Sequence, residues 1–179
     1  MLEIWKNKEK RPKMVLGAFF ILVVIFYGNT LFKGFVHDDI GQIVLNEHVQ
    51  SLQYLPKVVT GCIWEFELGD CITYYRPVQS FAYLVLWQFS SSPWIFHAAN
   101  LVFFIVAGWF VFLLIRKLTH DDFLAVLTGA IFLVHPIQNE AVSWISAFPE
   151  IAFTTCMLGC SLLYVAWKEE IKQDESGRF

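Results

Sequence analysis

The stretch MVLGAFFILVVIFYGNTLF, residues 14–32, decides the fold, because it carries no charged side chain. About 19 such residues in a helix can cross the hydrocarbon core of a bilayer, whereas the apolar part of a cleaved signal peptide has roughly 7–15. No small-x-small cleavage pattern follows the stretch, and five basic residues precede it: Lys6, Lys8, Lys10, Arg11 and Lys13. We therefore expect an uncleaved membrane anchor.

The overall composition also fits a bilayer better than water. Of the 179 residues, 56% are hydrophobic and only 16% are charged. Ordinary soluble domains have about 25% charged residues, and a soluble chain of this length could not bury so much apolar surface. The small formal net charge of -3 argues against nucleic acid as a partner.

Three further apolar runs are candidates for spans: residues 95–115, 123–134 and 151–167. The run 123–134 rises only about 18 Å as a helix, against a hydrocarbon core of about 30 Å. It must therefore extend at its ends or lie where the bilayer is thin. A fifth run, residues 77–89, begins with a proline and is short, as in an interfacial or re-entrant helix.

The distribution of Lys and Arg selects between four and five crossings. If residues 77–89 do not cross, ten basic residues lie on the side of the N-terminus and three on the other; if they cross, the numbers are five and eight. Cytoplasmic segments carry the basic excess, so we choose four spans. The sequence thus predicts an all-α membrane protein, with a cytoplasmic basic segment at 1–13, a membrane domain at 14–167 and a cytoplasmic tail at 168–179. Within the membrane domain we expect spans near 14–32, 95–115, 123–134 and 151–167. The outer loops at 33–94 and 135–150 carry interfacial helices.

The first candidate for chemistry is His37-Asp38-Asp39, which follows the first span within a few residues. Of two adjacent carboxylates, one can act as a general base or metal ligand while the other orients a partner. The alternative is that an aspartate caps a helix at residues 40–58.

Two other polar segments stand at the ends of apolar runs. In Tyr74–Pro77, Arg76 directly precedes the run 77–89, where its planar fork can bind a phosphate or its side chain can simply reach the headgroups. In His135–Glu140, the proline ends the third span and leaves His135 and Glu140 at the outer surface. These residues are functional candidates, or they belong to an ordinary helix-ending turn.

His97 and Asn100 share one face of the second span. Polar side chains within a span usually bond to another helix, so the structural role is the favoured one.

The four cysteines form two pairs by position. Cys62 and Cys71 share the first outer loop, where a disulfide is possible in an oxidising compartment. Cys156 and Cys160 lie one helical turn apart in the last span, and we expect them to be small, buried hydrophobic residues. Neither pair has further His or Cys residues at the spacing that a zinc site requires.

Taken in order, these motifs resemble a known family. The pattern is Phe35–Asp39 after the first span, then Tyr75–Pro77, Phe96–Asn100 and His135–Val142. Over roughly residues 14–167, this order and spacing is similar to the N-terminal membrane region of GT-C glycosyltransferases. The nearest branch is that of the transmembrane, tetratricopeptide-repeat O-mannosyltransferases and their bacterial relatives. The run His-Pro-x-x-x-Glu-Ala-Val is the most specific part.

The resemblance implies a partial GT-C architecture and a polyprenyl-phosphate sugar donor. It also implies inverting transfer of a sugar such as mannose to a hydroxyl of a protein or glycan acceptor at the outer or lumenal membrane face. The resemblance places Asp38, Asp39 and Glu140 in catalysis, with Asp38 the favoured base, and Arg76 at the donor phosphate. We further expect His135 at the donor phosphate, and His97, Asn100 and Glu150 in support. A divalent cation, Mn²⁺ or Mg²⁺, would be held by Asp38 or Asp39.

The sequence departs from this family in two respects. Residues 146–150 read Ser-Ala-Phe-Pro-Glu, where the family often has Gly-Arg-Ala-Asp or Arg-Lys-Asp, so Glu150 keeps the acid while the basic residue is absent. The chain also lacks the family's further spans and repeats, and we expect it to be the N-terminal portion of such an enzyme. The alternative is a non-catalytic membrane subunit or transporter fragment. The expected location is the plasma membrane of a bacterium or the endoplasmic reticulum of a eukaryote.

Overall fold

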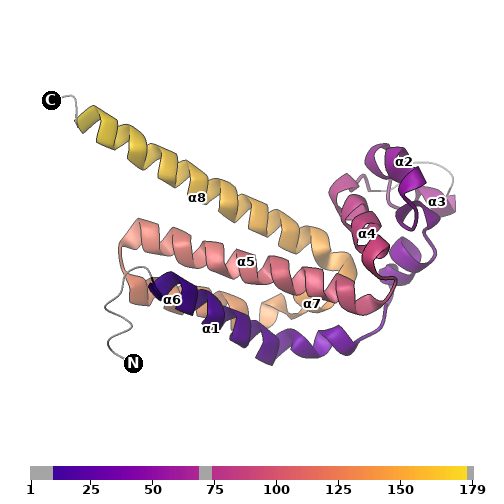
Figure 1. Ribbon diagram of the computed structural model, residues 1–179, viewed down its shortest axis with the longest axis horizontal. Coiled ribbons are helices and arrows are strands. Elements are labelled where there is room, and N and C mark those ends of the chain that lie inside the picture. Colours follow the sequence, from indigo (N-terminus) through magenta and orange to yellow (C-terminus); the bar gives the residue numbers. More distant parts are fainter. Residues whose placement is uncertain (1–9, 69–73, 177–179) are drawn as a thin grey trace. The chain divides into compact units, whose positions relative to one another are not determined.

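The computed structural model describes residues 10–68 and 74–176, and every regular element within them is helical (Figure 1). The predicted all-α class is therefore confirmed. Among the described residues, the chain divides into two compact units. Unit 1 takes in residues 10–26, 102–138 and 152–176, and unit 2 takes in residues 27–68, 74–101 and 139–151.

Unit 1 consists mainly of long apolar helices. They are α1 (Lys10–Tyr27), the larger part of α5 (Pro93–Thr119), α6 (Asp122–Val134) and the larger part of α8 (Phe148–Ser176), with the short η6 (Pro136–Gln138). Many of their large apolar side chains point outward, and Ile25 of α1 is 70% exposed. A helix that is apolar on all sides needs an apolar solvent, so these outer faces indicate contact with lipid.

Three helical stretches are long and apolar enough to cross a bilayer: Arg11–Phe32, Pro93–Thr119 and Ile145–Ile171. A fourth span results if α6 and the segment Pro136–Ser143 are taken together, as a helix pair bent by 48°. The helix α6 is as short as predicted, with 13 residues. The chain is therefore an integral, multi-pass membrane protein, as expected.

Glycines allow the helices of unit 1 to pack closely. A Cβ atom on Gly108 of α5 would lie 2.5 Å from Cδ2 of Leu133 on α6, and one on Gly129 of α6 would lie 2.6 Å from Cζ of Phe19 on α1. Phe19 also packs edge-on against Phe112 of α5, with the ring centroids 6.3 Å apart. Small residues at helix contacts are the usual means of close packing in membranes.

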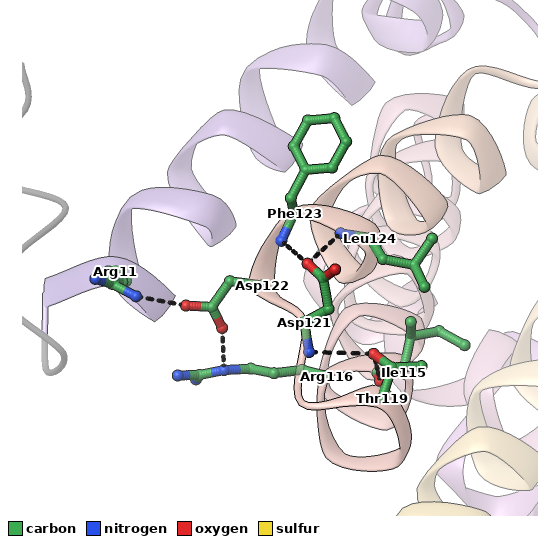
Figure 2. Close-up of polar contacts among 8 residues, drawn as sticks. All are labelled: Arg11, Ile115, Arg116, Thr119, Asp121, Asp122, Phe123 and Leu124. Carbon is green, nitrogen blue, oxygen red and sulfur yellow. Dashed lines mark hydrogen bonds and ion pairs between the residues drawn. The ribbon is translucent and has the colours of Figure 1, made fainter.

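A cluster of charged residues joins three helices of unit 1 at one end (Figure 2). Asp122 accepts from Arg11 Nη1 at 2.6 Å and from Arg116 Nε at 2.7 Å. The neighbouring Asp121 caps α6 by accepting from the backbone N–H groups of Phe123 and Leu124. The first turns of α1 and α6 and the last turn of α5 therefore meet at this end.

Unit 2 consists mostly of short helices. They are η2 (Gly28–Phe32), the π-helix η3 (Ile40–Val44), η4 (Glu47–Val49), η5 (Leu52–Tyr54), α2 (Leu55–Thr60), α3 (Glu65–Leu68), α4 (Pro77–Phe89), α7 (Asn139–Ser143) and η7 (Ile145–Ala147). Within this unit α4 packs against α2 and η4. Figure 1 shows α2, α3 and α4 gathered beside one another. The bounds of α4 agree with the run predicted at residues 77–89, and Pro77 is at its start.

The predicted alternative of one helix at residues 40–58 was wrong. The segment is broken into η3, η4, η5 and the start of α2. Local signals explain two of the breaks: the Asn46 side chain accepts from the N–H of His48 to begin η4, and Pro56 stands at the start of α2. Proline at a first helical turn and Asn at a cap are common helix starts.

The cysteines differ in part from expectation. Cys62 is disulfide-bonded, while Cys71, its candidate partner, lies outside the described residues. Cys156 and Cys160 are free and exposed on α8, so the prediction that they are buried was wrong. In a helix that is apolar on every side, the sequence does not reveal which face turns toward the protein.

Candidate functional site

A pocket of about 640 Å³ lies within unit 2. One side is the segment that follows the first apolar helix, with Val36, His37 and Asp38; the other comprises α7 and the residue after it, with Asn139, Glu140, Ser143 and Trp144. Two acidic side chains separated by about 100 positions in the sequence thus line one pocket. Both Asp38 and Glu140 are exposed, so a bound molecule can reach their carboxylates.

The backbone before Asp38 is in an unusual conformation. His37 has a φ of 48°, in the left-handed region that costs a residue with a side chain of order 1–3 kcal/mol. The π-helix η3 begins two residues after Asp38, and π-turns are rare and frequent at functional sites. The two aspartates therefore stand between the left-handed residue His37 and the π-helix η3 in the sequence.

Asp39 does not line the pocket; it is buried, with an exposure of 0%. Its Oδ1 accepts from the backbone N–H of Ser146 at 2.9 Å and from the Ser146 hydroxyl at 2.6 Å. Its Oδ2 accepts from the backbone N–H of Val36 at 3.1 Å. Because both oxygens are occupied, Asp39 fastens the segment before η3 to η7.

A buried polar network continues from Ser146 into α4. Gln79 Nε2, with two hydrogens to donate, lies within hydrogen-bond distance of three acceptors: the side-chain oxygen of Gln42, the Tyr83 hydroxyl and the Ser146 carbonyl. The Tyr83 hydroxyl donates to the carbonyl of Ile145 at 3.0 Å. Burial raises the pKa of the Tyr83 phenol far above its ordinary value, so the phenol keeps its proton for this bond.

His97 and Asn100 are buried on the first part of α5. Asn100 Nδ2 donates to the carbonyls of Val142 at 3.4 Å and Trp144 at 3.0 Å. These bonds connect the first part of α5 to the backbone at the end of α7. Neither ring nitrogen of His97 has a hydrogen-bond partner within the described part of the chain. Asn100 therefore has a structural contact of the kind expected for a polar residue in a span.

Arg76 belongs to unit 2 but is not among the residues that line the pocket. It precedes Pro77 at the start of α4, and its guanidinium carbon lies 4.9 Å from the ring centroid of Tyr74. No ion pair within residues 10–68 and 74–176 includes it. The residue is half-buried.

The remaining predicted residues lie elsewhere. His135 is in unit 1, exposed, and its Nδ1 accepts from the backbone N–H of Ile137 at 3.2 Å, as in a helix-ending turn. Glu150 is exposed in the first turn of α8. The pocket brings together Asp38 and Glu140, and it includes neither His135 nor Glu150.

The pocket offers few metal ligands. No group of three or more His, Cys, Asp or Glu side chains is placed to hold a metal ion among the residues that the structure describes. Mg²⁺, however, is often held by one or two carboxylates together with substrate phosphates and water. The exposed pair Asp38 and Glu140 fits that mode, whereas Asp39 is buried and both of its oxygens already accept hydrogen bonds.

Sequence reasoning missed several residues of the site. The sequence marks Ser146 only as part of a departure from the family pattern, whereas in the structure it is the partner of Asp39. Asn139 and Ser143 line the pocket and bond to each other at 3.3 Å. The helical spacing of these two residues was visible in the sequence, but the contact between Ser146 and Asp39 joins positions 107 residues apart.

Comparison with known proteins finds similar chains with a common description. Protein O-mannosyl-transferase Tmtc2 of Drosophila melanogaster is 31% identical over 87% of this chain and 17% of its own length. The corresponding values are 29%, 87% and 18% for protein O-mannosyl-transferase Tmtc1 of the same species, and 28%, 89% and 17% for human protein O-mannosyl-transferase TMTC3. No protein-family model and no solved structure matches the chain.

These similarities confirm the resemblance that the motifs predicted. They extend over most of the chain, while the chain spans less than a fifth of the length of these relatives.

Proposed function

We propose that this chain, as a relative of the protein O-mannosyl-transferases, forms the part of a membrane mannosyltransferase that holds the reacting groups. The observation that carries the proposal is the pocket with Asp38 and Glu140, built from two segments that are far apart in the sequence. The donor is a polyprenyl-phosphate sugar, and the acceptor is a hydroxyl of a protein or glycan. The surrounding architecture is that of a partial GT-C enzyme.

Asp38 is the general base. Its carboxylate accepts the proton of the acceptor hydroxyl while the hydroxyl oxygen attacks C1 of the sugar, and the bond from C1 to the phosphate oxygen breaks with its electron pair on the phosphate. A positioned base of this kind contributes roughly 10²–10⁴-fold to the rate. Asp39 is unsuited to this role because its oxygens already accept hydrogen bonds from Val36 and Ser146.

Glu140 is the second acidic group of the site. A Mn²⁺ or Mg²⁺ ion, if the reaction uses one, would be held by Asp38 and Glu140 with the donor phosphate, and it would supply positive charge to the leaving phosphate. Without such an ion, Glu140 orients the acceptor or the sugar through hydrogen bonds to its carboxylate.

Arg76 is the proposed contact of the donor phosphate. Support for Arg76 comes from its guanidinium, which stacks near Tyr74 and has no carboxylate partner among the described residues. A guanidinium can donate two parallel hydrogen bonds to one phosphate. His97, Asn100 and Glu150 act in support, Asn100 through its bonds to the backbone at Val142 and Trp144.

The reaction takes place on the outer or lumenal face. Residues 27–101 and 139–151 define unit 2 and correspond closely to the two predicted outer loops at 33–94 and 135–150. This agreement supports a common side for both loops. The basic excess of the remaining segments supports a cytoplasmic orientation for those segments.

The proposal is tested by Asp38→Asn in the longest natural form that contains this chain. Asn keeps the size of the side chain but loses its basicity, so transfer from a labelled polyprenyl-phosphate mannose in membranes should fall about 100-fold. Glu47→Gln is the matched control, because Glu47 is also an exposed acid of unit 2 and does not line the pocket. Wild-type transfer by a well-inserted Asp38→Asn protein would favour the alternative of a non-catalytic subunit.

A further inference from the structure

A second pocket lies entirely within unit 1, between the last turns of α5 and the facing part of α8. Its volume is about 440 Å³. Its lining has two basic side chains, one imidazole, one carboxylate and three apolar side chains: Arg116, Lys117, His120, Glu169, Leu113, Leu162 and Ala166. None of these residues has a part in the proposed transfer reaction.

The guanidinium of Arg116 is held in a fixed orientation. Its Nε donates to Oδ1 of Asp122 at 2.7 Å, and its Cζ lies 5.9 Å from the ring centroid of Phe112. Figure 2 shows the two terminal nitrogens pointing away from Asp122. Neither terminal nitrogen has a carboxylate partner within the described residues. The edge of the guanidinium that suits a phosphate is therefore available.

The charged groups of the pocket are partly paired. Arg116 is bound to Asp122 through Nε, and Asp122 also accepts from Arg11. Lys117 and Glu169, which both line the pocket, form an ion pair with each other. An anion at the terminal nitrogens of Arg116 would therefore leave these pairs in place.

His120 reaches the pocket through a shaped turn. It has a φ of 56°, and its N–H donates to the carbonyl of Arg116 at 2.9 Å, which ends α5 with a left-handed residue. The turn brings a third potential donor, the imidazole, to the same pocket as Arg116 and Lys117.

The apolar residues lie one or two helical turns from the charged ones. Leu113 precedes Arg116 by three positions on α5, and Leu162 and Ala166 precede Glu169 by seven and three on α8. The pocket thus has a cationic part toward the end of the helices and an apolar part toward their middle. A phosphate attached to an acyl chain has the same division, whereas a free phosphate ion has no apolar part.

We propose that this pocket binds an anionic phospholipid, with the headgroup phosphate on Arg116, Lys117 and His120 and an acyl chain against Leu113, Leu162 and Ala166. Basic pockets between spanning helices on the cytoplasmic side are suited to anionic headgroups, which are enriched in the cytoplasmic leaflet. The basic residues Arg11, Arg116 and Lys117 belong to segments expected on that side.

The test measures lipid binding by the purified full chain in mild detergent. Native mass spectrometry counts the phosphatidylserine and phosphatidylcholine molecules that remain bound at matched concentrations. We expect at least a tenfold preference for phosphatidylserine in the wild type, lost in Arg116→Gln. Arg11→Gln is the matched control, because Arg11 pairs with the same carboxylate and does not line the pocket, and it should bind as the wild type does.

Two further arms decide the remaining outcomes. Ala166→Phe fills the apolar part and keeps every charge, so it should also lose the preference and carries the test if Arg116→Gln does not fold. Inorganic phosphate at the same concentration as the lipid should not displace bound phosphatidylserine. Full displacement would assign the site to free phosphate and overturn the proposal of a lipid. Equal binding of both lipids by the wild type, or equal losses in Arg11→Gln and Arg116→Gln, would also overturn the proposal.

Discussion

Asp39 of unit 2 and Asp122 of unit 1 are carboxylates that each join distant segments, but they do so in different ways. Asp39 is completely buried and accepts three hydrogen bonds from uncharged donors. Asp122 has a side-chain exposure of 25% and accepts from two arginines (Figure 2). The contacts of Asp39 depend on well-placed hydrogen bonds in a site without solvent, whereas those of Asp122 depend on charge attraction in a partly exposed site. The two carboxylates should therefore respond differently to mutation and to salt.

The largest effect expected from this comparison concerns membrane sidedness. A cysteine at Gln53 in unit 2 should react in intact cells or sealed vesicles with an impermeant thiol reagent, whereas one at Thr119, near the cluster of Asp122, should react only after permeabilisation. Both positions are exposed, so access alone does not distinguish them. The background is a variant with Cys156 and Cys160 replaced, since both are free.

A cysteine at Ile137 completes the labelling experiment. Ile137 is exposed in η6, within the second predicted outer loop. It should label as Gln53 does. If it labels as Thr119 does, the four-span arrangement fails, and with it the proposal that Asp38 and Glu140 serve one site on the outer face.

The next effect concerns the buried carboxylate. In Asp39→Asn, either orientation of the amide directs its NH₂ group at an N–H or hydroxyl donor, because both oxygens of Asp39 accept bonds. A buried donor without an acceptor costs about 1–3 kcal/mol, and the variant should therefore unfold more readily by about that amount. Thermal unfolding of the purified chain in detergent measures the change.

Asp38→Asn is the control for this substitution, because it makes the same chemical change at the adjacent, exposed position. It should change the free energy of unfolding by less than about 0.5 kcal/mol. Equal losses in the two variants would mean that Asp38 also has a structural role, and would weaken its assignment as the base.

Local sequence signals predicted the parts of the fold that depend on local chemistry. The apolar runs identified the candidate spans, and the run at 77–89, which begins with Pro77, agrees with the bounds of α4. Asn46 and Pro56 carried equally local signals against a continuous helix at 40–58, and those were overlooked.

The tertiary contacts of the site were not accessible in this way. The bond between Asp39 and Ser146 and the shared pocket of Asp38 and Glu140 join segments about 100 positions apart. Nothing in the spacing of an aspartate pair reveals which member is buried, because that depends on the segment that packs over it. The exposure of Cys156 was mistaken for a related reason: an apolar helix has no polar face to mark its outer side.

The smallest effect concerns the paired carboxylate of unit 1. Asp122→Asn removes the charge that Arg11 and Arg116 share but leaves one oxygen as an acceptor for either arginine. Partly exposed ion pairs contribute about 0.2–1 kcal/mol each, so the variant should lose about 1 kcal/mol of unfolding free energy at low salt. Salt screens partly exposed charges and has little effect on hydrogen bonds in a dry core. The loss in Asp122→Asn should therefore shrink when thermal unfolding is repeated at about 1 M salt, where the screening length is roughly 3 Å, while the loss in Asp39→Asn stays the same. Should Asp122→Asn cost as much as Asp39→Asn at every salt concentration, the cluster is as dry as the core of unit 2, and the distinction between the two carboxylates does not hold.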